Sequence, residues 1–167
     1  ILLIQPDFLK RSETWNNRIE IFLNSDKEEI NQPNIAKMAI ATGGIMGKGI
    51  GNTTQGRFLS ESHNDFIFAI ISEELGFLGI VIVSILFLTI IYTGFKISMN
   101  SKDHFSKYLA FGITFQLAFQ TLLNLMVVVS LIPITGVTLP FLSYGGSSLL
   151  ITLCEMGVLL NISKHVK

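Results

Sequence analysis

The chain has 167 residues, of which 49% are hydrophobic and 14% are charged, and its formal net charge at pH 7 is zero. An ordinary soluble domain has about a quarter charged residues, so the composition argues against that class, and the zero net charge offers no electrostatic argument for nucleic-acid binding. Because Cys154 is its one cysteine, the chain cannot form an intrachain disulfide.

Residues 1–65 are expected to contain the end of one transmembrane helix and a long loop. Residues 1–8, “ILLIQPDF”, are interpreted as the last turns of that helix, and since the chain does not begin with Met, we expect a C-terminal fragment of a larger polytopic protein. In the loop, residues 9–65, Ser12 can cap a helix with one apolar face, which suits either a membrane interface or an ordinary soluble helix. The residues of that face are Trp15, Ile19, Phe22 and Leu23.

The loop contains a glycine-rich segment, “GGIMGKGIGNTTQG”, at residues 43–56. Dense glycines can present backbone N–H groups to an anion, but two nucleotide-binding motifs fail. The Walker A pattern needs Gly where Thr42 stands and Ser or Thr where Gly49 stands, and no βαβ unit surrounds the segment. A flexible loop is therefore preferred to an anion-binding loop.

Two apolar runs predict transmembrane helices. No Asp, Glu, Lys or Arg occurs at residues 75–95 or 108–132, and each run exceeds the ~20 residues that a helix needs to cross the ~30 Å hydrocarbon layer. We predict the helices at residues 66–97 and 108–132, joined by a polar loop at residues 98–107. A buried core helix is the alternative for either run, but two such runs in a short chain favour a membrane protein.

A third apolar segment, residues 148–163, contains Glu155 and is also predicted to cross the membrane, followed by a short tail at residues 164–167. An interfacial or re-entrant segment is the alternative, because the apolar part is short. The predicted fold class is therefore all-α: a polytopic membrane protein, here with about three transmembrane helices and a large loop.

The connection at residues 133–147 is expected to be irregular, because Pro133 and Pro140 interrupt helices and the pair Gly145–Gly146 permits a tight turn. Non-helical backbone at membrane depth needs protein or water to satisfy its polar groups. The segment is predicted either to line a cavity or to form an ordinary surface hairpin.

One family carries several strings of this chain in the same order. The strings are “NRIEIFLN”, “AIATGGIMGKGIGN”, “FLSESHNDFIFAIISEELGFLG”, “IPITGVTLPFLSYGGSSLL” and “NISK”, and they span the chain from about Arg18 to the C-terminus. In these strings the chain resembles the shape, elongation, division and sporulation (SEDS) proteins, which include RodA and FtsW.

The resemblance implies a multi-pass protein of the bacterial cytoplasmic (inner) membrane that polymerises lipid II into glycan strands for cell division or elongation. It implies lipid II, membrane lipids and a class B penicillin-binding protein as partners. Loop charges leave the orientation open, because the positive-inside rule is weak for long loops. The resemblance implies that residues 9–65 and 133–147 face outward, and that residues 98–107 and 164–167 face the cytoplasm. The fragment alone is expected to be inactive, since other helices should complete the cavity.

Asp65 matches the essential aspartate of the family's H-x-D-F-I-F motif, and the resemblance implies a catalytic role for it. A carboxylate there can act as general base on the hydroxyl of the acceptor sugar, which contributes ~10²–10⁴-fold to a rate. From the residues alone, a helix N-cap or an acid of the first helical turn is the alternative.

Substrate binding is predicted for further side chains. Lys48 and Arg57 can stabilise a leaving pyrophosphate, with a solvated loop charge as the alternative. A divalent cation, Mg²⁺ or Mn²⁺, can also stabilise the pyrophosphate. No protein-bound metal and no organic cofactor is predicted. Glu73 and Glu74 are predicted to face a wet cavity or polar partners on helices outside this chain, with a structural role favoured over direct chemistry. The predicted substrate-binding residues are Lys48, Arg57, His63, Glu73, Glu74, Ser143 and Tyr144.

Two other classes of function remain as alternatives. A lipid II flippase would use broken helices and buried acids to move the lipid without making bonds. A non-catalytic membrane scaffold would recruit the division machinery. Polymer formation by the purified protein separates the enzyme from both.

Overall fold

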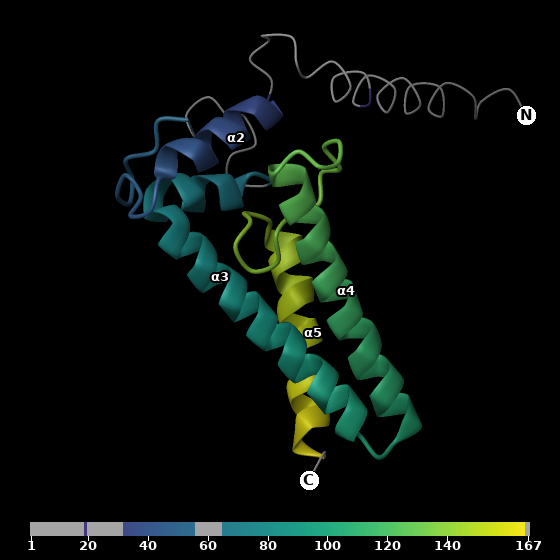
Figure 1. Ribbon diagram of the computed structural model, residues 1–167. Helices are drawn as coiled ribbons and strands as arrows, with labels where there is room; N and C mark the ends of the chain where they lie inside the picture. Colours follow the sequence, from purple (N-terminus) through teal and green to yellow (C-terminus); the bar gives the residue numbers. More distant parts are fainter. Residues whose placement is uncertain (1–18, 20–31, 56–64, 166–167) are drawn as a thin grey trace, which may run out of the picture.

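The computed structural model describes residues 19, 32–55 and 65–165. The truncated helix predicted at residues 1–8, the helix predicted to begin at Ser12, and the predicted site residues Arg57 and His63 lie outside the described residues. The described part consists of helices joined by irregular segments, and it contains no strand (Figure 1). The prediction of an all-α fold is confirmed.

Helix α2, Gln32–Gly43, packs against the first turns of helix α3, Ile67–Asn100. Ile35, Ala36 and Ala39 form its buried face, and this spacing of i, i+1 and i+4 is that of one side of a helix. The sequence interpretation did not separate α2 from the glycine-rich segment. The helix ends where the chain turns at Gly44, whose φ is +60°, a conformation that glycine adopts without steric cost.

Helix α3 is bent at Gly76, whose φ of 68° and ψ of −161° are not helical. Such a backbone conformation is essentially restricted to glycine. The turns before Gly76 lie across the bundle beside α2, and residues 77–100 run along it (Figure 1). This second part is about 36 Å long at 1.5 Å per residue, which is enough to cross a membrane.

Helices α4, His104–Val128, and α5, Gly146–Lys164, complete the bundle. Together with α3, both are long and apolar enough to span a membrane, so the prediction of three transmembrane helices is confirmed. Helix α4 ends at Val128, earlier than the apolar run suggests, and Ser130 follows with a positive φ of 57°. A left-handed residue ends a helix even where the sequence stays apolar.

Asp103 caps the start of α4. Its carboxylate accepts hydrogen bonds from the backbone N–H and the hydroxyl of Ser106, both at 3.0 Å. These bonds favour the ionised form and hold the pKa of Asp103 below its usual value. The polar cap explains why α4 begins at His104, before the apolar run itself.

Helices α3 and α4 approach each other through small residues, as is common in membranes. A Cβ added to Gly94 of α3 would lie 2.4 Å from the Thr114 hydroxyl oxygen of α4, so a side chain there would separate the two helices. Most of the apolar side chains on the outside, such as Leu88 and Leu160, are exposed. The larger buried cluster joins α2, α3, α4 and the 133–140 segment: Ile35, Ala36, Ala39, Phe66, Phe68, Ala69, Phe87, Val127, Val128 and Leu139.

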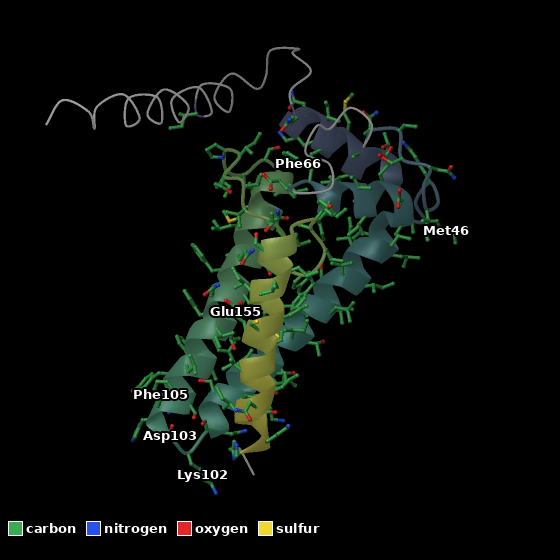
Figure 2. All side chains as sticks on the ribbon, turned by 180° about the vertical axis from the view of Figure 1, so that it is seen from behind. Met46, Phe66, Lys102, Asp103, Phe105 and Glu155 are labelled. Carbon is green, nitrogen blue, oxygen red and sulfur yellow. The ribbon has the colours of Figure 1, made fainter. Side chains whose placement is uncertain are left out.

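The two ends of the bundle carry different parts of the chain. Phe66 and Met46 mark the end that carries α2 and the glycine-rich segment, whereas Lys102, Asp103 and Phe105 mark the opposite end (Figure 2). The α4–α5 connection returns to the first end, beside the start of α3 (Figure 1). Residues that are far apart in the sequence therefore meet at one end of the bundle.

Replacing Gly76 by Ala is expected to destabilise the protein. The new Cβ would lie 2.3 Å from the Gly47 backbone nitrogen, at a φ that L-residues avoid, and such strain costs about 1–3 kcal/mol. Gly112→Ala is the matched control, because nothing lies within 4 Å of its added Cβ in the helix, and alanine there favours the helix by up to about 1 kcal/mol. Thermal unfolding of the purified protein in detergent measures both, and equal melting temperatures would contradict the interpretation.

Candidate functional site

Glu73 lies at the centre of a buried polar cluster. Its side chain has no exposed surface, and the donors to its two carboxylate oxygens among the described residues belong to residues 48–55. We call Glu73, Glu74 and residues 48–55 together the Glu73 cluster. The donors are the Lys48 ammonium at 2.6 Å, the Thr53 hydroxyl at 2.6 Å, the Thr54 hydroxyl and N–H at 2.7 and 3.1 Å, and the Gln55 N–H at 3.2 Å.

This donor set suits an ionised carboxylate. A buried charge is tolerated where an opposite charge and further hydrogen bonds satisfy its lone pairs. The Lys48 side chain is 29% exposed, so one side of the ion pair reaches the surface while Glu73 does not. The same ammonium also donates to the Thr54 hydroxyl at 2.8 Å.

Backbone hydrogen bonds attach the glycine-rich segment to the bend of α3. The N–H groups of Lys48 and Gly49 donate to the carbonyls of Glu73 and Glu74, each at 3.0 Å, and the Phe77 N–H donates to the Gly44 carbonyl at 2.9 Å. The carbonyls of Glu73 and Glu74 lack partners within α3 because the helix is interrupted at Gly76. The segment predicted to be a flexible loop is thus tied to α3.

The cluster brings together three of the predicted site residues, Lys48, Glu73 and Glu74. The Glu74 carboxylate accepts from the Gly51 N–H at 3.1 Å. Both acids have polar partners, as predicted for acids near a span, but the partners belong to the glycine-rich segment of this chain. A substrate-binding role for these three residues stays a prediction.

Asp65 lies at the start of α3, half-buried. Its backbone carbonyl accepts a hydrogen bond from the side-chain amide of Asn124 on α4 at 2.9 Å. Its carboxylate faces the α4–α5 connection, since a Cβ added to Gly136 would lie 3.9 Å from Asp65 Oδ2. The candidate general base therefore sits where the start of α3, the end of α4 and the connection meet.

Further along, the connection forms a tight turn at residues 140–142. Phe141 has a positive φ of 65°, and the Leu142 N–H donates to the Pro140 carbonyl at 2.8 Å across it. This is a strained turn for a bulky residue. The Ser143 hydroxyl stabilises it by accepting from the Leu139 N–H at 2.7 Å, and strained backbone of this kind is concentrated at functional sites.

A cleft of about 430 Å³ opens beside the turn. This volume lies within the range of ligand pockets, ~300–1,000 Å³. Two of the predicted substrate-binding residues, Ser143 and Tyr144, line it, and Tyr144 is 81% exposed. Ile67, two residues after Asp65, also lines it. The full lining is Ile67, Leu142, Ser143, Tyr144, Gly145, Gly146 and Leu149.

Glu155 has a polar partner on the neighbouring helix α4. It lies partway along α5 (Figure 2), and its carboxylate accepts from the Gln116 amide of α4 at 2.8 Å. One turn further along α4, the Gln120 amide donates to the Thr138 carbonyl at 2.9 Å. Polar groups at Gln116, Gln120 and Asn124 therefore follow one face of α4 at helical spacing.

Sequence reasoning missed Asn124, Gln120 and the threonines of the Glu73 cluster. A signal existed for the first two, because an amide within an apolar transmembrane run is costly and usually has a function or a partner. Thr53 and Thr54 carried no comparable signal, since threonines are common in loops. Their role depends on a fold-back of the segment that no local pattern indicates.

The described residues do not fit a protein-bound metal centre. Across residues 32–55 and 65–165, no group of three His, Cys, Asp or Glu side chains lies close enough to hold an ion. No step is therefore assigned to such a centre.

Comparison with known proteins identifies the family. A family model described as “Cell cycle protein”, covering FtsW, RodA and SpoVE, matches residues 1–167. The chain belongs to the FtsW/RodA/SpoVE family. The resemblance inferred from the sequence strings is thus confirmed.

Several curated members of the FtsW/RodA/SpoVE family are similar to this chain. Stage V sporulation protein E of Bacillus subtilis (strain 168) is 42% identical over 166 residues, covering 99% of this chain and 44% of the relative. The probable peptidoglycan glycosyltransferase FtsW of the same strain is 51% identical over 130 residues, covering 77% and 32%. The protein of that name from Geobacter sp. (strain M18) is 44% identical over 131 residues, covering 78% and 36%.

A solved structure has the same fold. It comes from work described as “Structural coordination of polymerization and crosslinking by a peptidoglycan synthase complex” and is similar with a TM-score of 0.69 and 28% identity, covering 95% of this chain and 46% of the solved one. The chain thus spans less than half the length of these relatives.

Replacing Lys48 by Met is expected to destabilise the protein, because it leaves the buried Glu73 carboxylate without a cation. Removing one partner of a buried pair costs up to ~5 kcal/mol, and the partial exposure of Lys48 reduces our expectation to about 1–3 kcal/mol. Thermal unfolding in detergent measures the change.

The matched control for this test is Lys37→Met, which alters an exposed lysine of α2 and should leave the melting temperature nearly unchanged. In the double variant Lys48→Met/Glu73→Gln the uncompensated charge is gone, so its destabilisation should be smaller than the sum of the two single effects. Strict additivity would contradict an interaction between the two side chains.

Proposed function

We propose that the complete protein is a peptidoglycan glycosyltransferase that polymerises lipid II, with Asp65 as its general base. Family membership and relatives named probable peptidoglycan glycosyltransferase support this activity. The observation that carries the proposal is the position of Asp65: half-buried at the end of a membrane-spanning helix, next to Gly136, with Ile67 of the same helix lining the 430 Å³ cleft.

The reaction needs a base at this position. The hydroxyl oxygen of the acceptor sugar attacks the anomeric carbon of the lipid-linked donor, the bond from that carbon to the pyrophosphate oxygen breaks with inversion, and the hydroxyl proton passes to the Asp65 carboxylate. A base must lie within hydrogen-bond reach of the proton that it removes. Asp65 is half-buried beside the connection that contains Gly136.

Binding of the sugar is proposed for the cleft. Ser143 and Tyr144 line it and offer polar groups, and an exposed aromatic ring such as that of Tyr144 can pack against a sugar face. Arg57, His63 and Glu74 are retained as proposed substrate-binding residues.

The leaving pyrophosphate needs positive charge. Lys48 is proposed to supply part of it from the exposed side of its ion pair with Glu73, because ammonium groups bind phosphate as point charges. A divalent cation, Mg²⁺ or Mn²⁺, carried by the pyrophosphate itself is a further candidate. Glu73 then acts on substrate indirectly, by holding Lys48 and the adjacent segment.

The protein is a multi-pass membrane protein by its helices and its family. We propose the bacterial inner membrane as its location, with the end that carries Asp65 and the glycine-rich segment facing outward. A class B penicillin-binding protein is the proposed partner, supported by the similar solved chain from a peptidoglycan synthase complex.

Lipid II transport is the second candidate function. The Gln116–Glu155 hydrogen bond places an acid and an amide within the spanning helices, and intramembrane acids are characteristic of transport pathways. Transport without polymerisation in proteoliposomes would favour this candidate.

Asp65→Asn in the complete protein is expected to reduce the rate of lipid II polymerisation by about 100-fold or more, because an amide cannot accept the proton. Labelled lipid II and the protein in lipid nanodiscs with its penicillin-binding partner provide the assay. Asp103→Asn is the matched control: it makes the same change at the opposite end of the bundle, where asparagine still caps a helix. Polymerisation that survives in Asp65→Asn would overturn the proposed base.

A further inference from the structure

Asn124 is a fully buried polar residue near the end of α4, with none of its surface exposed. Its amide nitrogen donates two hydrogen bonds, one to the backbone carbonyl of Asp65 at 2.9 Å and one to the carbonyl of Val137 at 2.7 Å. The two acceptors are 59 and 13 residues away in the chain. One side chain thus joins α4 to the start of α3 and to the α4–α5 connection.

The carbonyl oxygen of the Asn124 side chain differs from its amide nitrogen in its hydrogen bonding. Asn124 Oδ1 is buried and has no hydrogen-bond partner among the described residues. Burying a carbonyl oxygen without a donor costs free energy, so packing alone would favour an apolar side chain here, like those of the neighbouring Val127 and Val128. What Asn124 supplies at this position is its pair of N–H donors.

The two acceptors define the surroundings of Asp65. Val137 follows Gly136, and Gly136 is the residue whose added Cβ would lie 3.9 Å from Asp65 Oδ2. The amide therefore holds the Asp65 backbone and the segment in front of its carboxylate at a fixed separation. Gly136, with a φ of 73°, brings no side chain into the space beside that carboxylate.

We propose that Asn124 is a positioning residue for Asp65. By donating to both carbonyls it holds the Asp65 backbone, and with it the Asp65 carboxylate, against the 133–140 segment. The inference rests on the proposed function of Asp65 as general base. It assigns no direct contact with substrate to Asn124 itself.

The geometry predicts how activity should respond. Without the amide, the protein can still bind lipid II through the cleft, but the base is no longer held at its working position. A displacement of about 1 Å can reduce a catalytic rate by ~100-fold. Loss of Asn124 should therefore reduce kcat while KM changes little.

The test uses three variants of the complete protein in nanodiscs with its penicillin-binding partner. Asn124→Leu removes both donors at similar volume, Asn124→Ser keeps one smaller donor, and Asn124→Gln keeps the amide on a longer side chain. We expect kcat for polymerisation of labelled lipid II to fall ~10-fold or more in the first two with KM within about 3-fold, and to recover partly in Asn124→Gln.

Gln120→Met is the matched control. Gln120 lies one turn earlier on α4 and donates to the Thr138 carbonyl, so this variant loosens the same connection without releasing Asp65. Its kcat should stay within about 3-fold of the wild-type value, since it leaves the base in place. An equal loss in Gln120→Met and in the Asn124 variants would overturn the proposal in favour of a general effect on the connection.

Wild-type kcat in folded Asn124→Leu or folded Asn124→Ser would also overturn the proposal. Thermal unfolding establishes which variants are folded, and the serine variant serves as the test if the leucine variant is not. Asp65→Asn is measured in parallel: activity there refutes the proposed base, whereas an inactive Asp65→Asn beside a fully active Asn124→Ser refutes only the positioning role.

Discussion

The hydrogen bonding of one buried carboxylate determines the arrangement around the candidate site. Glu73 has no contact with solvent, so its donors must come from protein. Residues 48–55 supply them, with the Lys48 ammonium as the charged member. Because those donors lie on the glycine-rich segment, satisfying the carboxylate also folds that segment onto α3. The bend at Gly76 makes this possible by freeing backbone carbonyls for further hydrogen bonds.

Gln55 and Asp65 are each held by hydrogen bonds to a polar side chain, one charged and one neutral. At one side the Gln55 N–H contacts the Glu73 carboxylate, and at the other the Asn124 amide contacts the Asp65 carbonyl. The first hydrogen bond is to the Glu73 carboxylate, and the second is from the neutral Asn124 amide. Both lie at the same end of the bundle, where the 133–140 segment also returns. Polar groups thus define this end, while small and apolar residues pack the spans.

The sequence predicted the fold class well because apolar runs of spanning length have few other interpretations. It predicted the bounds less well, since Asp103 and Ser130 set the ends of α4 through local hydrogen bonding and backbone angle. The family strings led to Asp65, Ser143 and Tyr144, which lie at one end of the bundle. The pairing of Lys48 with Glu73 spans 25 residues, and Asn124 reaches Asp65 over 59; contacts of that range depend on tertiary folding and have no local pattern.

The bend at Gly76 also determines where Asp65 lies relative to the span of α3. The turns between it and Asp65 lie crosswise to the span (Figure 1), which displaces the acid sideways by roughly 13 Å, the length of nine helical residues. Asp65 is thereby brought next to Asn124 of α4 and Gly136 of the α4–α5 connection. One residue inserted into this arm would rotate the acid by ~100° about the arm's axis and turn it away from Gly136. The length of the arm is therefore constrained to within one residue.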